Sequence, residues 1–325
     1  MRYVIYGAGG IGGGIGTQLL RAGYEVVLIA RGPHLERIRE VGLTVRTPEG
    51  TETLSIEAVK APSEIDFRGD EVVFFTMKSQ DTLAALKDLR ERAGVDVPVI
   101  MAQNGVVNER SAARRFRRVY GMLVYMPALF LEPGVVVLHG MPRRGVLHAG
   151  CYPNGTDEHI EAVCGDLNEA GFDSRPELSI MRLKYGKLLM NLGNSAQALC
   201  GLEADLKDLT RALRLEGMRC FDAAGIDFVS AKGLVQLCEE SYELGEIEGH
   251  PRLGGSSWQG LMRGVRSIES DYLNGEVVLL GKRYGVATPL NRSVQELSVQ
   301  AVREGFEPGS IGVEEIWARA RQDQQ

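Results

Sequence analysis

Three glycines near the start of the chain have the spacing that binds a dinucleotide pyrophosphate. Gly7, Gly9 and Gly12 form Gly-x-Gly-x-x-Gly directly after a short apolar run. The first glycine permits a sharp turn, the second lets a phosphate approach the backbone, and the third lets a helix pack closely on the strand. A purely structural turn is the alternative, but a second apolar run follows at the spacing of a βαβ unit. The predicted nucleotide-binding loop comprises Gly7, Ala8, Gly9, Gly10, Ile11 and Gly12.

The residue at the end of the second predicted strand indicates which dinucleotide binds. Sites for NAD or FAD usually carry an acid there, which accepts a hydrogen bond from the ribose 2′-hydroxyl, whereas this chain has Arg31. A guanidinium binds a 2′-phosphate through paired, charge-assisted hydrogen bonds. We therefore expect NADP(H) as the cofactor. A solvated surface arginine is the alternative.

Two more polar residues follow predicted strands of the same sheet. Lys78 comes after the strand at 71–76, and Asn104 comes after the strand at 97–102. Ligands of open α/β sheets bind beyond the carboxyl ends of the strands, where a nicotinamide riboside would lie. Position alone leaves a solvated lysine and a plain Asn-Gly turn open as alternatives.

A second polar group lies on one predicted helix. Lys187, Asn191 and Asn194 stand at i, i+4 and i+7, which makes one polar stripe on an otherwise apolar helix. Gly186 and Gly193 interrupt the same stretch, and each costs roughly 1 kcal/mol relative to Ala, which indicates a close neighbour. A stripe that meets only water is the alternative.

Glu269 precedes a segment whose sequence is compatible with either a tight turn or a helix. Asn274-Gly275 is typical of a tight turn, but the spacing of the apolar residues around it favours a helix. Taken alone, Glu269 is more typical of a surface carboxylate than of a catalytic one.

The elements that would position these residues alternate through the first half of the chain. This alternation predicts an α/β fold with an N-terminal Rossmann-type doubly wound sheet, followed from about residue 180 by an all-α C-terminal domain. We expect domain limits of 1–178 and 179–325, with a loop at 251–257. The predicted strands are 2–6, 25–30, 71–76, 97–102, further strands in 43–59 and 119–151, and a short closing strand at 172–175; the predicted helices are 11–22, 33–41, 82–93 and 157–170.

Composition narrows the class of protein. The chain has 325 residues, of which 25% are charged and 44% apolar, and a net charge of −6. The dense basic run at 114–118 falls in a predicted helix and is typical of a solvated face, so we expect no nucleic-acid partner. No stretch of 18 apolar residues occurs, so we expect no membrane partner and a cytoplasmic protein. The five cysteines and five histidines lack ligand spacing, which predicts free thiols and no metal.

Taken together, the motifs resemble the ketopantoate reductase (2-dehydropantoate 2-reductase) family. The resemblance extends in order and spacing from residue 1 to about 300. It rests on Gly7-x-Gly9-x-x-Gly12, Arg31, Lys78, Gln103-Asn104-Gly105, Lys187-Leu-x-x-Asn191, Ser256-Ser257, Glu269-x-Asp271-Tyr-Leu-Asn274-Gly275 and Gly285-Val-x-Thr-Pro289-x-Asn291.

The resemblance implies roles that the residues alone do not establish. It makes Lys187 the proton donor and Glu269 its acidic partner. It implies that Asn191, Asn194 and Ser257 bind the substrate, a small 2-oxo acid. It also implies that Lys78 and Asn104 lie at the nicotinamide, with Asn104 contacting the substrate as well. An ammonium suits this reaction because hydride transfer to a 2-oxo carbon leaves negative charge on oxygen. A homodimer is left open.

The chain departs from the family pattern at two points. Where the family has a second Asn followed by Pro, the Asn stands one position early at 194, Ser195 takes its place and no Pro follows. An acid usual after the second Ser is Leu261 here. These departures put the identity of the 2-oxo acid in doubt, while an opine-type dehydrogenase and a non-catalytic NADPH sensor remain alternatives.

Overall fold

The chain divides into two compact units in a computed structural model, which describes residues 1–130, 132–251, 254–262 and 268–322. Unit 1 contains residues 1–184 and 232–252, and unit 2 contains 185–231 and 253–325. The expected domain limits, 1–178 and 179–325, stay predictions. The contacts group Lys184 with unit 1, and they return 232–252 to unit 1 because a strand in this segment pairs there.

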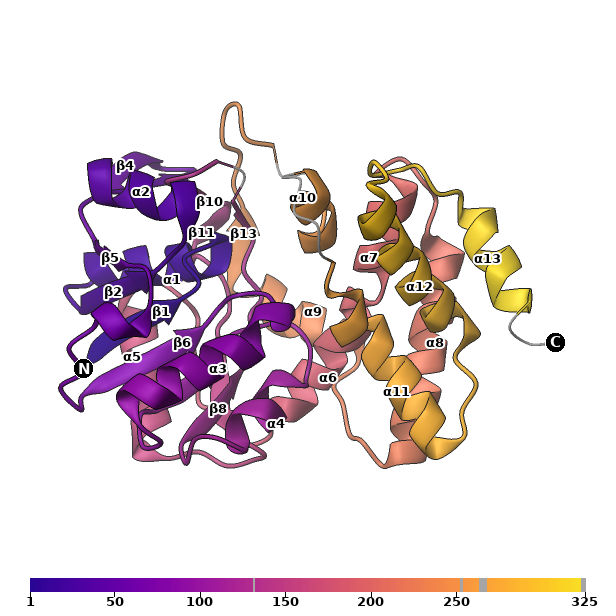
Figure 1. Cartoon of the computed structure of the whole chain (residues 1–325), viewed down its shortest axis with the longest axis horizontal. Coiled ribbons are helices and arrows are strands. Elements are labelled where there is room, and N and C mark those ends of the chain that lie inside the picture. The colour runs from indigo at the N-terminus through magenta and orange to yellow at the C-terminus, as the bar shows by residue number, and fades with distance from the viewer. Residues whose placement is uncertain (131, 252–253, 263–267, 323–325) are drawn as a thin grey trace. The chain divides into compact units, whose positions relative to one another are not determined.

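Unit 1 is built on a seven-stranded sheet of order β12-β8-β7-β6-β1-β2-β5, in which neighbouring strands are parallel except for the antiparallel pair β12 and β8 (Figure 1). The chain passes from β1 to β2 on one side and returns to β6 on the other, so the strand order reverses between β1 and β6. Ligands of doubly wound sheets bind at this point. The strands of the sheet are β1 (Arg2–Tyr6), β2 (Glu25–Ile29), β5 (Glu57–Val59), β6 (Glu71–Phe75), β7 (Val99–Met101), β8 (Val119–Met122) and β12 (Ala149–Cys151).

Helices cover both faces of this sheet. Alternate residues of β1 point to opposite faces: Tyr3 and Ile5 pack in one core cluster, and Val4 and Tyr6 pack in the other. Because both faces of the sheet are buried, its strands are continuous apolar runs in the sequence. Their positions could therefore be predicted from the sequence. The helices of this part are α1 (Gly10–Arg21), α2 (Gly32–Val41), the short 3-10 turn η1 (Pro62–Glu64), α3 (Ser79–Ala93), α4 (Asn108–Ala113) and α5 (Glu158–Glu169).

A smaller sheet packs on the other side of α1. Its order is β4-β3-β10-β9, and α1 contacts β10, β9 and β3 as well as β1 and β2. A separate two-stranded pair, β11 with β13, joins residues 140–142 to 242–244. These strands are β3 (Leu43–Thr47), β4 (Gly50–Leu54), β9 (Ala128–Leu129), β10 (Val135–Leu138), β11 (Gly140–Pro142) and β13 (Tyr242–Leu244).

In the part of unit 2 that the structure describes, helices are the regular elements (Figure 1). Here α7 packs on α8, α10 and α12, and α11 packs on α8 and α12. Two helices, α6 (Ile180–Asn191) and α9 (Ala231–Glu239), cross the division between units. The other helices are α7 (Gly193–Cys200), α8 (Lys207–Ala224), α10 (Ser256–Met262), the 3-10 turn η2 (Glu269–Tyr272), α11 (Asn274–Tyr284), α12 (Pro289–Glu304) and α13 (Val313–Gln322).

Several local predictions need correction. The basic run at 114–118 is not helical, because α4 ends at Ala113 and the run forms the turn before β8. Residues 172–175 do not form a strand: Asp173 forms an isolated bridge to Val146, and a second isolated bridge joins Pro176, just beyond this segment, to Ala149. The predicted loop at 251–257 includes the start of α10 at Ser256, and its residues 252 and 253 lie outside the described residues.

Candidate functional site

The glycine-rich loop follows β1 at the point where the strand order reverses. Gly7 has a φ of +110°, and a Cβ there would lie 2.7 Å from the backbone nitrogen of Met77, so only glycine fits. A Cβ on Gly12 would overlap the carbonyl oxygen of Gly7 and the hydroxyl of Thr76, which donates to that carbonyl at 2.8 Å. These contacts explain the first and third glycines by close packing between β1, β6 and α1.

The start of α1 is open to an anion. Gly9 is the N-cap residue, so no side-chain cap hydrogen bond is formed there. The first N–H groups of a helix also have no acceptor within the helix. A Cβ on Gly9 would meet only Phe130, at 3.9 Å. Backbone N–H groups and the helix dipole together favour phosphate at such an end.

Arg31 lies at the end of β2 as the N-cap residue of α2, with an exposed side chain. The hydroxyl of Tyr6 donates to Asp88 at 2.8 Å. Burial raises the pKa of Tyr6, hydrogen bonding to Asp88 adds to this, and the nearby Arg31 guanidinium opposes it. The Arg31 guanidinium is therefore close enough to the Tyr6 hydroxyl to affect its pKa, at the carboxyl ends of β2 and β1.

Gln103 joins the loops that carry Lys78 and Asn104. Its amide nitrogen donates to the carbonyl of Met77 and to the hydroxyl of Thr82, each at 2.7 Å. Lys78 is the N-cap residue of α3 and Asn104 follows Gln103 directly; both are half-buried. The structure thus brings the two predicted loops together at neighbouring strand ends, through a residue to which the sequence analysis gave no role of its own.

A buried ion pair contacts the end of β7 and the loop that follows it. Lys184 places its Nζ 2.7 Å from Oε1 of Glu109, and both side chains are almost inaccessible. The ammonium also donates to the carbonyls of Met101, Gln103 and Met122. Burial raises the pKa of Glu109, and the Lys184 charge opposes the increase. Sequence reasoning missed this pair because its members lie on α4 and α6, far apart in the chain.

In unit 2, the predicted polar stripe lies at a junction between two helices. Lys187 and Asn191 belong to α6 and Asn194 belongs to α7, and the pattern is interrupted at Leu192. The side chain of Asn274 donates to the carbonyl of Leu192 at 3.1 Å. This bond supplies the carbonyl with a donor at the interruption, so the single continuous helix of the prediction becomes two.

The three residues of the predicted polar stripe differ in solvent exposure. Lys187 and Asn194 are half-buried, whereas Asn191 is 8% exposed and its amide nitrogen has no hydrogen-bond partner among the described residues. Ser195 is fully buried, and its hydroxyl likewise has no partner within the described part of the chain. Asn194, rather than Ser195, therefore has the accessible side chain. The close neighbour expected at Gly193 is Thr210 of α8, 3.1 Å from a Cβ built on Gly193.

Segments far apart in the sequence meet this junction. A Cβ on Gly255 would lie 3.4 Å from the Asn194 side chain, and the Gly255 amide donates to Gln197 at 2.7 Å. Ser257, two residues on, is buried at the start of α10. Glu269 is buried in the first position of η2, five residues before Asn274. The side chain of Leu261 lies outside the described residues.

A buried hydrogen-bond network holds Asn274 in place. Its amide nitrogen also donates to Asn291 at 3.0 Å, and the amide nitrogen of Asn291 donates to Glu216 at 2.8 Å. Glu216 accepts two further bonds, from the backbone N–H groups of Leu290 and Asn291. Burial raises the pKa of Glu216, while these hydrogen bonds oppose the increase.

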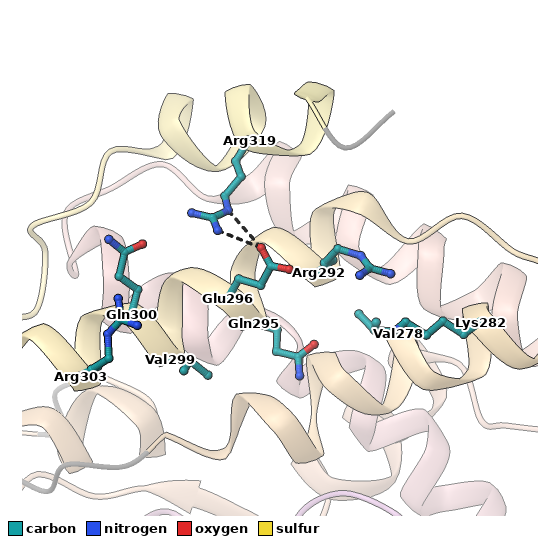
Figure 2. A pocket seen from close by; sticks show the side chains of 9 residues that line it. All are labelled: Val278, Lys282, Arg292, Gln295, Glu296, Val299, Gln300, Arg303 and Arg319. Carbon is teal, nitrogen blue, oxygen red and sulfur yellow. Dashed lines mark hydrogen bonds and ion pairs between the residues drawn. The ribbon is translucent and has the colours of Figure 1, made fainter. Parts of the chain in front are cut away.

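A surface pocket of unit 2 contains none of the predicted site residues. Figure 2 shows Arg319 forming two contacts to one oxygen of Glu296, at 2.9 and 3.2 Å. The pocket is lined by residues of α11, α12 and α13, namely Val278, Lys282, Arg292, Gln295, Glu296, Val299, Gln300, Arg303 and Arg319.

The described residues contain neither a metal-binding cluster nor a membrane-spanning helix. No group of three His, Cys, Asp or Glu side chains converges there as a metal site requires. No disulfide joins the cysteines in the described part of the chain, and three of the five are buried. None of the described helices combines the length and apolar character needed to cross a bilayer.

A Rossmann-type α/β unit with a glycine-rich loop, together with a helical unit, defines the class of fold. The family model described as "Ketopantoate reductase PanE/ApbA" matches residues 3–154, and the model of its C-terminal region matches residues 179–301. The chain therefore belongs to the ketopantoate reductase family, and it is an oxidoreductase.

Individual relatives agree with this membership. The chain is 31% identical over 301 residues to a 2-dehydropantoate 2-reductase of Pyrococcus horikoshii, covering 90% of this chain and 94% of the relative. It is 29% identical over 314 residues to one of Archaeoglobus fulgidus, covering 94% and 99%.

Solved structures show the same fold. A ketopantoate reductase from Ralstonia eutropha superposes with a TM-score of 0.77 at 28% identity, over 94% of this chain and 99% of that one. D-mandelate dehydrogenase, solved with NADH and anilino(oxo)acetate, superposes with a TM-score of 0.80 at 22% identity, over 94% and 99%. At this identity the second likeness concerns the fold alone.

Proposed function

We propose that this chain uses NADPH to reduce a 2-oxo acid to a 2-hydroxy acid, nominally 2-dehydropantoate to pantoate. The observation that carries the proposal is the family match across both parts of the chain, which includes the glycine-rich loop as well as Lys187 and Glu269. A nicotinamide cofactor fits the family. The preference for NADPH is the finer part of the proposal, and a homodimer remains a prediction.

The residues of unit 1 fit a dinucleotide with a 2′-phosphate. The uncapped start of α1 suits a pyrophosphate, and the space beside Gly9 lets the backbone approach it. Arg31, with no acid at the end of β2, suits a 2′-phosphate. Lys78 and Asn104, at the neighbouring strand ends, would hold the nicotinamide end.

The residues of unit 2 supply the acid chemistry in this proposal. When bound, the cofactor delivers a hydride to the 2-oxo carbon. Lys187 stabilises the negative charge that develops on the substrate oxygen and protonates it. Glu269 keeps the ammonium in place. Asn191, whose buried amide nitrogen has no partner among the described residues, would bind the substrate together with Asn194 and Ser257.

A panel of 2-oxo acids, followed by NADPH absorbance with and without an added amine, tests the proposal. We expect turnover of ketopantoate without amine. A requirement for amine would establish the opine-type alternative. NADPH binding without turnover of any 2-oxo acid would establish the sensor alternative.

Selectivity within the panel tests the substrate assignment. Ser195 is fully buried, and an apolar Leu261 stands where the family has an acid, so fewer polar groups are available for the 4-hydroxyl of ketopantoate. We expect a preference below about 10²-fold in kcat/KM over a branched 2-oxo acid without that hydroxyl. A preference of about 10⁴-fold or more would show that the remaining polar residues suffice.

A further inference from the structure

His34, on α2, connects the glycine-rich loop to the segment just before β10. It is 8% exposed. Its Nε2 lies 2.6 Å from the carbonyl oxygen of Ala8, and its Nδ1 accepts a hydrogen bond from the backbone N–H of Gly134 at 2.8 Å. Its ring packs on Phe130, with 4.5 Å between ring centroids.

These two contacts determine the tautomer of the ring. The backbone N–H of Gly134 can only donate, so Nδ1 carries a lone pair. The carbonyl oxygen of Ala8 can only accept, so Nε2 carries the proton. His34 is therefore a neutral imidazole with both nitrogens engaged.

The bond to Ala8 acts on the peptide between Ala8 and Gly9, whose N–H donates to the carbonyl of Gly7 at 2.8 Å. The carbonyl of Ala8 and the N–H of Gly9 belong to one rigid peptide plane, and Gly9 is the N-cap residue of α1. The imidazole thus fixes the orientation of the peptide at the start of this helix. His34 also lies three residues after Arg31, the N-cap residue of α2.

We propose that His34 is a positioning residue for the dinucleotide, which holds the glycine-rich loop in its phosphate-binding conformation and in register with Arg31. This inference rests on the proposed function. It goes further by assigning a role to a side chain that touches neither the reacting atoms nor the 2′-phosphate. The β9–β10 turn takes part through Gly134, which anchors the other side of the ring.

Two substitutions separate the two hydrogen bonds. The amide of Gln reaches as far as Nε2 of histidine, so His34→Gln keeps a donor for Ala8. The amide of Asn reaches only as far as Nδ1, so His34→Asn keeps an acceptor for Gly134 and loses the bond to the loop. His159→Asn, on half-buried His159 of α5, is the control.

The measurement is the Kd for NADPH and for NADH, by calorimetric titration, alongside Tm for each variant. We expect His34→Asn to weaken both dinucleotides about three- to tenfold, the range for one lost hydrogen bond. His34→Gln should stay within twofold of the unsubstituted protein, although both variants lose one bond and a similar amount of Tm. Equal weakening of both dinucleotides separates this role from that of Arg31, which acts on the 2′-phosphate alone.

Two results would overturn the inference without affecting the proposed function. If the unsubstituted protein binds NADPH but His34→Asn and His34→Gln have equal Kd values, the bond to Ala8 does not position the loop. If Kd follows Tm across the variants, His34 has only a structural role. Failure of the unsubstituted protein to bind either dinucleotide would overturn the proposed function, and this inference with it.

Discussion

Lys184 and Glu109 form an ion pair, 2.7 Å from Nζ to Oε1, in which both side chains are almost inaccessible to solvent. The same ammonium binds the carbonyls of Met101 and Gln103 at the end of β7. Removing one partner of a buried pair leaves an uncompensated charge, which is far more costly than losing an exposed pair.

We therefore predict that Lys184→Met lowers the free energy of unfolding by about 3–5 kcal/mol. The double variant Lys184→Met with Glu109→Leu should recover part of this loss, since no charge remains buried. Urea denaturation measures both. Lys87→Met, which removes an exposed i,i+4 pair with Glu91, is the control and should change stability by less than about 0.5 kcal/mol. A loss below about 1 kcal/mol for Lys184→Met would contradict a buried pair.

The bond from Asn274 to Leu192 gives a second prediction, for the junction of α6 and α7. Asn274→Ala leaves the Leu192 carbonyl and the Asn291 side chain without this donor, at a cost of about 1–3 kcal/mol. Because Leu192 follows Asn191, we also expect KM for the 2-oxo acid to rise while the Kd for NADPH stays unchanged. Gln300→Ala, on the surface of α12, is the control. An unaltered KM would separate this network from the substrate site.

Arg31 gives the prediction for cofactor choice. Arg31→Ala removes a charged partner of the 2′-phosphate, and hydrogen bonds to charged groups contribute about 1.5–3 kcal/mol. NADPH should bind at least about tenfold more weakly, while the Kd for NADH hardly changes. Exposed Arg92 of α3 supplies the control, Arg92→Ala. Equal weakening of both cofactors would remove Arg31 from the 2′-phosphate site.

His148 gives the prediction for pH dependence. It is 2% exposed, neither ring nitrogen has a partner in the described part of the chain, and burial lowers its pKa. The unfolded state therefore binds a proton near pH 6.5 that the folded state does not bind, so unfolding free energy falls as pH drops below 6.5 towards the folded pKa.

The variant His148→Leu should lose this contribution, which is at most about 1.4 kcal/mol per pH unit. Urea midpoints at pH 7.5 and 5.5 measure it in both proteins. Identical pH dependence in the variant and the unsubstituted protein would show that folding does not lower the pKa of His148.

The fold could be predicted from the sequence where an element leaves a pattern within a short stretch of the chain. The strands of the seven-stranded sheet are buried on both faces, so they appear as apolar runs, and the spacing of Gly7, Gly9 and Gly12 reports a strand–turn–helix unit. The pairing of β13 with β11 could not be predicted, because a three-residue strand in a helical context has too short a pattern.

Contacts between a side chain and distant backbone atoms could not be predicted from the sequence. His34 was one of five scattered histidines in the sequence, because its partners are backbone atoms of Ala8 and Gly134, which no residue type reveals. The break at Leu192 was missed because its hydrogen-bond donor, Asn274, comes from a distant segment.

The most direct test of the proposed reductase is the kcat of Lys187→Ala for ketopantoate at saturating NADPH, measured together with its Kd for NADPH. We predict that kcat falls by about 10²-fold or more, as for loss of a general acid, while the Kd stays near that of the unsubstituted protein. Lys282→Ala, on an exposed lysine of α11, should change neither value. An unchanged kcat in Lys187→Ala would contradict the assignment and transfer the proton-donor role to another residue, with Lys78 the next candidate.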